Sequence, residues 1–138
     1  MINFHVEDID FRLQQKLKIK NWLKRIIEEE GFKAGDINYI FCSDDYLLKI
    51  NIEYLDHDFL TDIITFDNSE EEERIDGDIF ISIDRVKDNA TAFQASFEHE
   101  LKRVLAHGVL HLCGYMDKTD EEEKLMRTKE NQYLQLFQ

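Results

Sequence analysis

The sequence is organised around residues 107–117, which spell HGVLHLCGYMD. Apolar residues recur at helical spacing over residues 93–112, so we expect a long amphipathic helix here. His107 and His111 are four residues apart, and side chains at that spacing lie on one face of a helix. Both imidazoles can therefore point at one metal ion.

The residues that follow the second histidine supply a third candidate ligand. Gly114 permits the left-handed conformation that ends a helix, so the chain can turn back and bring Asp117 toward the histidines. Three protein ligands with an open fourth position are typical of a catalytic zinc site. A zinc protease of the His-Glu-x-x-His type has its general base directly after the first histidine, where this chain has Gly108. The pattern predicts a metal-dependent hydrolase and makes a metalloprotease the weaker interpretation.

The composition suits one domain over residues 1–138, since 43% of the residues are hydrophobic and 12% aromatic. No apolar run approaches the roughly 20 residues of a membrane span, and the start lacks the features of a signal peptide. Two cysteines, Cys42 and Cys113, are too few for a disulfide framework. We expect a cytoplasmic protein without a membrane partner.

The charge is −13 at pH 7, and the whole excess lies in residues 41–138 because the first forty residues balance. An acidic chain does not bind nucleic acid through bulk electrostatics, so RNA would have to be contacted locally. The basic residues from Arg12 to Arg25 are one candidate patch; the alternative is the solvated face of an amphipathic helix. The glutamate run within residues 68–76 predicts an exposed hairpin loop.

The order of apolar and turn residues predicts an α+β domain. We expect four strands at residues 2–6, 37–42, 61–66 and 77–82, with the third buried on both faces and antiparallel to the fourth. We expect helices from a cap at Asp8 or Asp10 to Gly31, over 44–54, over 84–90 as a helix or turn, over 93–114 and from Thr119 onward. The expected architecture is one small four-stranded mixed sheet packed against four or five helices, with the metal site at the end of the long helix.

The stretch at residues 107–115 resembles the signature of the YbeY family of rRNA maturation factors, which are metal-dependent endoribonucleases. The family pattern is His-Gly-x-Leu-His-Leu-x-Gly-Tyr-Asp-His followed by a methionine, and Met126 stands where that methionine is expected. Residues 61–66, TDIITF, resemble the family's Thr-Asp-Val-Leu-Ser-Phe, and residues 77–82, GDIFIS, resemble its Gly-Asp-Ile-x-Ile. Asn51 and Tyr54 match further positions. The resemblance implies action on rRNA or a precursor of the small ribosomal subunit, with a ribosome-associated protein as a second candidate partner.

Several positions depart from the family pattern. Asp117 stands where the family has its third histidine, and two histidines with one carboxylate are also a catalytic zinc set. The carboxylate would make bound water less acidic and would favour harder ions such as manganese or iron beside zinc. Alternatively, Asp117 only supports a ligand. Leu55 replaces an arginine associated with activity, and Leu60 replaces a proline; Arg85 or Arg103 could substitute for the lost guanidinium.

The resemblance suggests that one divalent ion, zinc first, activates a water or stabilises charge on a phosphate oxygen. Asp62 is the candidate catalytic residue, either for proton transfer or for holding a ligand histidine in its tautomer; the alternative is a turn residue before a strand. His57 could contact substrate or lie on the surface. The leading hypothesis is a metal-dependent endoribonuclease in rRNA processing. The alternative is a catalytically weak ribosome-biogenesis factor that binds metal and a protein or RNA partner.

Overall fold

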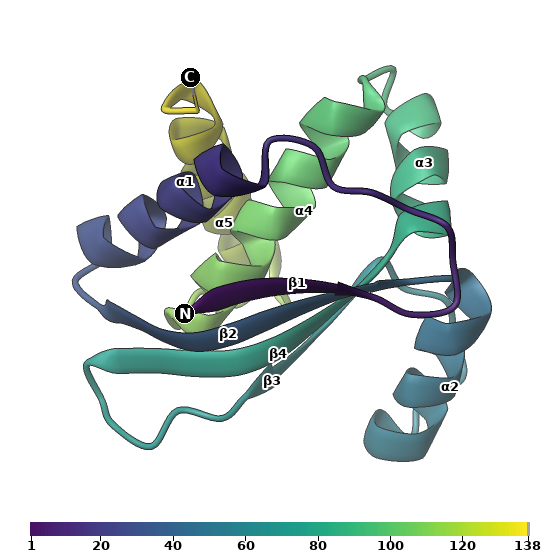
Figure 1. Ribbon diagram of the computed structural model, residues 1–138, viewed down its shortest axis with the longest axis horizontal. Coiled ribbons are helices and arrows are strands. Elements are labelled where there is room, and N and C mark those ends of the chain that lie inside the picture. Colours follow the sequence, from purple (N-terminus) through teal and green to yellow (C-terminus); the bar gives the residue numbers. More distant parts are fainter. Residues whose placement is uncertain (138) are drawn as a thin grey trace.

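A four-stranded mixed sheet with helices on both faces forms the protein, and the computed structural model describes residues 1–137 (Figure 1). Along these residues the elements are β1 (Ile2–Val6), α1 (Lys16–Glu29), β2 (Lys33–Cys42), α2 (Asp44–Leu55), β3 (Ile63–Asp67), β4 (Arg74–Ser82), α3 (Ile83–Ala92), α4 (Phe97–Leu112) and α5 (Asp120–Gln135). The α+β class, the four-stranded mixed sheet and the five helices confirm the prediction.

The strands lie in the order β1-β2-β4-β3. The pairs β1–β2 and β2–β4 are parallel, whereas β3 is antiparallel to β4, as predicted for the third and fourth strands. The third strand is shorter and less buried than predicted, because it lies at the edge of the sheet and has a neighbour on one side only. Ile63 packs toward the main core and Ile64 toward a smaller cluster on the other face, while Asp62 precedes the strand.

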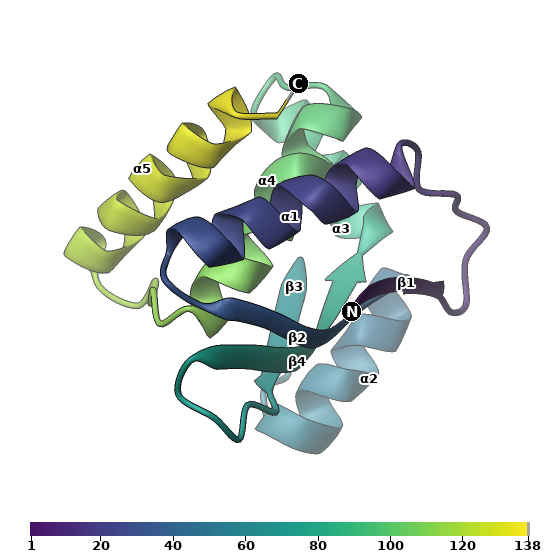
Figure 2. The ribbon, with the colours of Figure 1, turned by 60° about the vertical axis from the view of Figure 1, so that its left-hand side comes forward.

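The helices divide unequally between the two faces of the sheet. Figure 2 shows α1 and α4 crossing one face with α5 beside them, whereas α2 lies on the opposite side. The main core includes Leu23 of α1, Leu105 of α4 and Ile79 of β4, and Tyr39 donates a buried hydrogen bond of 2.7 Å to the Leu105 carbonyl. These contacts hold α4 against the sheet. Among the described residues, no helix has both the length and the apolar character needed to cross a membrane.

The long helix begins later than predicted. Phe93 follows the end of α3 as its C-cap, and Gln94 adopts a left-handed conformation (φ 56°) that no helix can continue through. Ser96 then caps α4, its hydroxyl accepting a hydrogen bond from the His99 amide at 3.1 Å. The apolar periodicity over residues 93–112 therefore spans two helices. Phe93 is left exposed at the junction.

The predicted cap of the first helix was wrong. α1 begins at Lys16 and has no side-chain cap. Asp8 instead accepts hydrogen bonds from the amide and hydroxyl of Ser43, the residue that caps α2. The intervening residues 7–15 form neither helix nor strand. Leu13 is buried in the main core, and Phe11 packs edge-on against Phe41 at 5.1 Å between ring centroids.

Candidate functional site

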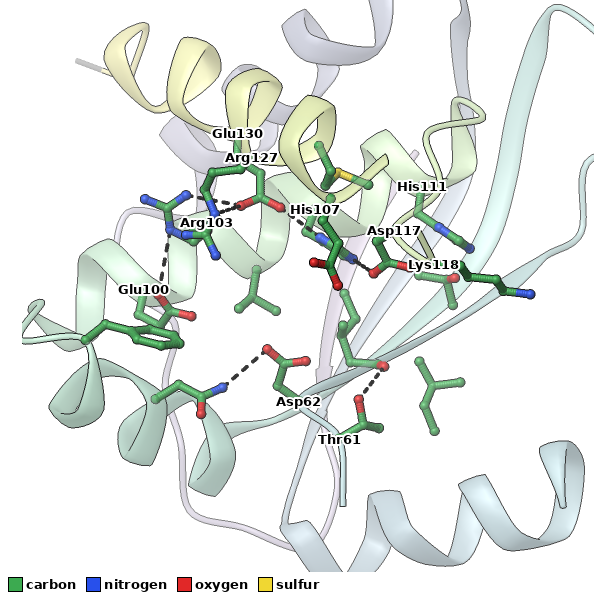
Figure 3. Close-up of a pocket in the computed structure, with 18 of the residues that line it drawn as sticks. Thr61, Asp62, Glu100, Arg103, His107, His111, Asp117, Lys118, Arg127 and Glu130 are labelled. Carbon is green, nitrogen blue, oxygen red and sulfur yellow. Dashed lines mark hydrogen bonds and ion pairs between the residues drawn. The ribbon is translucent and has the colours of Figure 1, made fainter. Parts of the chain in front are cut away.

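The two histidines of the sequence pattern face the same cleft from α4 (Figure 3). Their rings are nearly parallel, with an interplanar angle of 3° and 6.5 Å between centroids. This geometry follows from the four-residue spacing, which places His107 and His111 one turn apart on one face of the helix. Both rings lie on one face of α4 as predicted, and their binding of one metal ion stays a prediction.

Hydrogen bonds fix the tautomer of both rings. The Nδ1 atom of His107 lies 2.8 Å from a carboxylate oxygen of Glu130, and Nδ1 of His111 lies 3.1 Å from the carbonyl oxygen of Tyr115. Both partners are acceptors, so each Nδ1 carries the proton and donates it. In the neutral form of each ring, Nε2 then keeps its lone pair, as metal-binding histidines require. The donor chemistry of the pair fits a divalent transition ion.

The third predicted ligand lies beside the first histidine. Asp117 is exposed, and its carboxylate is 3.3 Å from Nε2 of His107, the atom that would bind a metal. Among residues 1–137, no three His, Cys, Asp or Glu side chains are arranged to hold an ion as they stand. This contact is an ion pair only when the His107 ring is protonated, and the role of Asp117 as a metal ligand stays a prediction.

The residue that orients His107 was missed by the sequence analysis. Glu130, on α5, is 4% exposed, yet it carries a carboxylate that His107 and Arg103 both contact. The Arg103 guanidinium donates to it at 3.1 Å. A buried carboxylate needs such partners, because desolvation of an unpaired charge is costly. Glu130 therefore ties α5 to the face of α4 that carries the two histidines.

Negative charge surrounds His107. Burial by itself would lower the pKa of this histidine, but the hydrogen bond and charge of Glu130, together with the charges of Asp117 and Asp62, raise it overall. These charges favour a cation at this position, whether a proton or a metal ion.

Asp62 lies in the cleft, immediately before β3. Its carbonyl accepts a hydrogen bond of 3.0 Å from the Ser82 amide, and its carboxylate has a long contact of 3.5 Å with the Asn89 amide. Within the described residues no hydrogen bond joins Asp62 to either histidine; Glu130 and the Tyr115 carbonyl hold the tautomers instead. Burial raises the pKa of Asp62 above that of an exposed aspartate, a shift in the direction that favours proton exchange. Its catalytic role stays a prediction.

The cleft is large, about 1260 Å³, whereas pockets for small molecules measure roughly 300–1,000 Å³. It runs from the loop before β3, past the end of α3 and the histidine face of α4, to the start of α5. Its cationic lining consists of Arg103, Lys118, Lys124 and Arg127. Leu55 and His57 also line it, so the position where the resemblance leads one to expect an arginine does face the cleft.

Of the two arginines considered as substitutes, only Arg103 lies in the cleft. Arg85 forms ion pairs with Asp44 at 2.9 Å and with Asp88 at 3.5 Å. Arg103 is 14% exposed and is occupied by Glu130. Arg127 was not singled out from the sequence, but its side chain is 54% exposed and lines the cleft. Its guanidinium is 3.8 Å from Glu130, and its exposure leaves it able to meet a phosphate.

Two other residues of the motif serve the core. A Cβ on Gly108 would lie 3.0 Å from Ile79 and 3.3 Å from Ile63, so position 108 faces the sheet and not the cleft. Cys113 packs against the main core, and burial raises the pKa of its thiol to about 12. A neutral thiol is a poor metal ligand at pH 7.

A buried carboxylate also holds the turn that orients His111. Glu30, at the end of α1, accepts a hydrogen bond from the Tyr115 hydroxyl at 2.6 Å and another from the Tyr133 hydroxyl. Lys129 forms an ion pair with it at 3.3 Å. Because the carbonyl of Tyr115 is the acceptor for His111, Glu30 connects α1 and α5 to the position of the second histidine.

Comparison with known proteins gives a consistent result. A family model described as "Endoribonuclease YbeY" matches residues 1–138. A protein of that name from Cytophaga hutchinsonii is 55% identical over 135 residues, covering 98% of this chain and 94% of its own. One from Flavobacterium johnsoniae is 55% identical over 137 residues, covering 99% and 97%. The solution structure of a Thermotoga maritima protein has a TM-score of 0.68 at 30% identity, covering 98% of this chain and 87% of that one.

The Glu30 network predicts a pH-dependent loss of stability on Glu30→Gln. Burial opposes ionisation of Glu30, but its hydrogen bonds and Lys129 lower its pKa overall. Because the folded-state pKa is the lower one, the stabilisation is complete above the unfolded pKa of about 4.3 and is lost as pH falls through the folded value. We expect the free energy of unfolding of the variant at pH 7 to be about 1–3 kcal/mol lower than that of wild type, because charge-assisted hydrogen bonds are lost.

Urea unfolding of both proteins between pH 3 and pH 7 tests this expectation. The difference in free energy of unfolding between wild type and variant should become smaller as the solution is acidified below pH 4. A difference that is constant across this range would show that the charge of Glu30 does not stabilise the fold.

The buried contact to His107 predicts weaker metal binding on Glu130→Gln. The amide oxygen of Gln can still accept from His107, but the negative charge is lost, and such a change at a ligand's partner costs about 10–100-fold in metal affinity. Affinity is measured by competition with a chromophoric zinc chelator at pH 7. Glu123→Gln removes an exposed carboxylate from the same cleft and should change affinity far less. Equal affinity in wild type and Glu130→Gln would contradict the assigned role.

Proposed function

The chain belongs to the endoribonuclease YbeY family, a family of hydrolytic enzymes, and from this premise we propose that it is a metal-dependent endoribonuclease. In this proposal it cleaves RNA phosphodiesters in rRNA processing and ribosome maturation. The observation that carries the metal-dependent part is the paired tautomer control of His107 and His111. Glu130 and the Tyr115 carbonyl accept from Nδ1, so that both neutral rings direct the Nε2 lone pair to the cleft, where Asp117 contacts that of His107.

His107, His111 and Asp117 would hold one divalent transition ion, zinc first. When bound, such an ion acts as a Lewis acid on a phosphoryl oxygen or lowers the pKa of water. The exposed carboxylate of Asp117 can turn to the ion because it lies in the loop between α4 and α5, already beside Nε2 of His107. Two histidines with a carboxylate form a known catalytic set.

Asp62 is the residue proposed to move a proton. Its carboxyl group lies in the same cleft as His107, and its raised pKa brings it nearer to neutrality than an exposed aspartate. Position 108 cannot supply a general base, because it is a glycine that faces the sheet. This last point also counts against the metalloprotease interpretation.

Binding of the RNA backbone is assigned to the exposed cations at the rim of the cleft. Arg127, Lys118 and Lys124 line the cleft from the loop before α5 and from its first turns. A guanidinium suits a phosphate because it can donate two parallel hydrogen bonds. Arg127 would thus replace the arginine that the family has where this chain has Leu55. The proposed substrates are rRNA or a precursor of the small ribosomal subunit, met in the cytoplasm.

One observation favours a second candidate function. Leu55 lines the cleft where the family resemblance implies an arginine, and Arg103 is occupied by buried carboxylates. A catalytically weak factor that binds metal and an RNA or ribosome-associated protein partner would tolerate this loss. The two functions differ in one measurable property, the metal-dependent cleavage of RNA.

Cleavage of a structured rRNA fragment is expected to require both the metal and His111. Removal of metal by chelation should abolish cleavage, and adding back zinc, manganese or iron should restore it. His111→Ala should reduce the rate by at least about a hundredfold, because it removes a ligand and with it the ion's contribution. His99→Ala, an exposed histidine at the start of the same helix, is the matched control and should retain activity. Equal cleavage by wild type and His111→Ala would overturn the proposal, and metal binding without cleavage would favour the second candidate.

Asp117→Ala is expected to lower the metal content of the purified protein. Elemental analysis of protein prepared without chelator or affinity metal should find about one transition ion per chain in wild type. The variant should lose it wholly or largely if Asp117 is a ligand. Asp120→Ala removes another exposed carboxylate of the cleft and serves as the control. Full retention of metal in Asp117→Ala would reduce Asp117 to a supporting role.

A further inference from the structure

The cleft continues beyond the metal-binding histidines to a second carboxylate on α4. Glu100 precedes His107 by seven residues, which is two turns or about 10 Å along the same helix face. Both residues line the cleft, and Figure 3 shows the carboxylates of Glu100 and Asp62 turned toward the same space. This inner part of the cleft lies next to the proposed reaction centre and takes no part in holding the metal.

Glu100 is buried but poorly satisfied. It is 3% exposed, and within residues 1–137 its carboxylate accepts no hydrogen bond. Its ion-pair partner is the Arg103 guanidinium, at 3.7 Å, and the positive charge of Arg127 also acts on it. That guanidinium donates its closer hydrogen bonds, at 3.1 Å, to Glu130 and Asn131. Buried carboxylates normally accept several hydrogen bonds, so Glu100 has acceptor capacity left for a ligand in the cleft.

An exposed aromatic ring and an amide complete this part of the cleft. Phe93 is 59% exposed and lines the cleft from the junction of α3 and α4. The amide of Asn89, one helical turn earlier, also lines it and makes the long contact of 3.5 Å with Asp62. A large exposed aromatic in a nucleic-acid site is suited to stack on a base, a contact that contributes regardless of sequence.

We propose that Glu100 and Phe93 form a subsite for a guanine base next to the phosphate that is cleaved, with Asn89 at its edge. The proposal rests on the proposed function, since it assigns base selectivity to the same cleft. A carboxylate presents two acceptor oxygens side by side, and guanine alone among the four bases presents two adjacent donors, N1–H and the N2 amino group, on its pairing edge. Single-stranded RNA is recognised in this way, by stacking together with hydrogen bonds to base edges. The Arg103 guanidinium beside Glu100 disfavours a metal ion at this position.

The simpler role for Glu100 is to neutralise Arg103. In that case the carboxylate would help to position Glu130 and His107 through Arg103, and its removal would weaken metal binding and all RNA binding alike. A guanine subsite predicts a different result, because it binds guanine more tightly than a base of the same shape that lacks the N2 amino group. Hypoxanthine, the base of inosine, is such a base.

The test is a binding measurement that does not depend on cleavage. Short 2′-O-methyl oligouridylates carrying one guanosine, one inosine or neither are titrated against the protein by fluorescence anisotropy, and their integrity is checked afterward by electrophoresis. Wild type should bind the guanosine oligomer roughly ten- to a hundredfold more tightly than the inosine oligomer, the range of one well-made base contact. Glu100→Gln should abolish this difference while binding of plain oligouridylate stays the same.

Phe93→Ala should weaken binding of all three oligomers by roughly five- to a hundredfold, because stacking is lost whatever the base. Phe93→Tyr keeps a ring and should bind normally. Equal affinity of wild type for the guanosine and inosine oligomers overturns the subsite without any variant. A uniform loss in Glu100→Gln, accompanied by lower zinc affinity, also overturns it and identifies Glu100 as a positioning residue. The test measures binding alone. A failure of the guanine subsite can therefore be distinguished from a failure of the proposed metal-dependent cleavage, which is measured separately.

Discussion

The buried carboxylate of Glu130 is the constraint on which the geometry of the site depends. At 4% exposure it must be compensated, and its two oxygens are used separately, one by Arg103 and the other by Nδ1 of His107. Removal of either partner would leave the buried carboxylate of Glu130 incompletely paired, which would destabilise the folded protein by several kcal/mol. The position of α5 against α4 is therefore coupled to the orientation of the first histidine. A change that loosens α5 should therefore alter the orientation of His107 before it alters the sheet.

A second carboxylate plays the corresponding role for His111. Glu30 holds the hydroxyl groups of Tyr115 and Tyr133, and the carbonyl of Tyr115 accepts the Nδ1 proton of His111. The turn that begins at Gly114, with φ of 109°, would otherwise be a short exposed connection. Each histidine is thus oriented from outside its own helix. The helix fixes the spacing of the rings, and the tertiary contacts fix which nitrogen each ring presents.

Local patterns account for what could be predicted from the sequence. The spacing of His107 and His111 and the end of α4 near Gly114 follow from helical periodicity and glycine conformation. The later start of α4 was missed because apolar spacing cannot register the left-handed Gln94 between two helices. Glu130 and Arg127 were missed for another reason. α5 contains many charged residues. Contacts with α4 decide which of them is buried and which faces the cleft, and these contacts cannot be predicted from the local sequence.

Two of the departures from the family pattern, at positions 117 and 55, act on charge in the cleft. An aspartate in place of a third histidine adds a negative charge beside His107, and a leucine in place of an arginine removes a positive one. With a protein charge of −13 as well, a phosphate receives little attraction from a distance. Affinity for RNA must then come from short-range contacts, through the rim cations and through the bases. Single-strand binding weakens with salt in proportion to the phosphates contacted, so a protein that holds RNA mainly by its bases depends little on salt. The same reasoning makes an acceptor with no direct hydrogen bond, such as Glu100, useful, because a base edge is a neutral donor that an acidic cleft can bind without a phosphate contact.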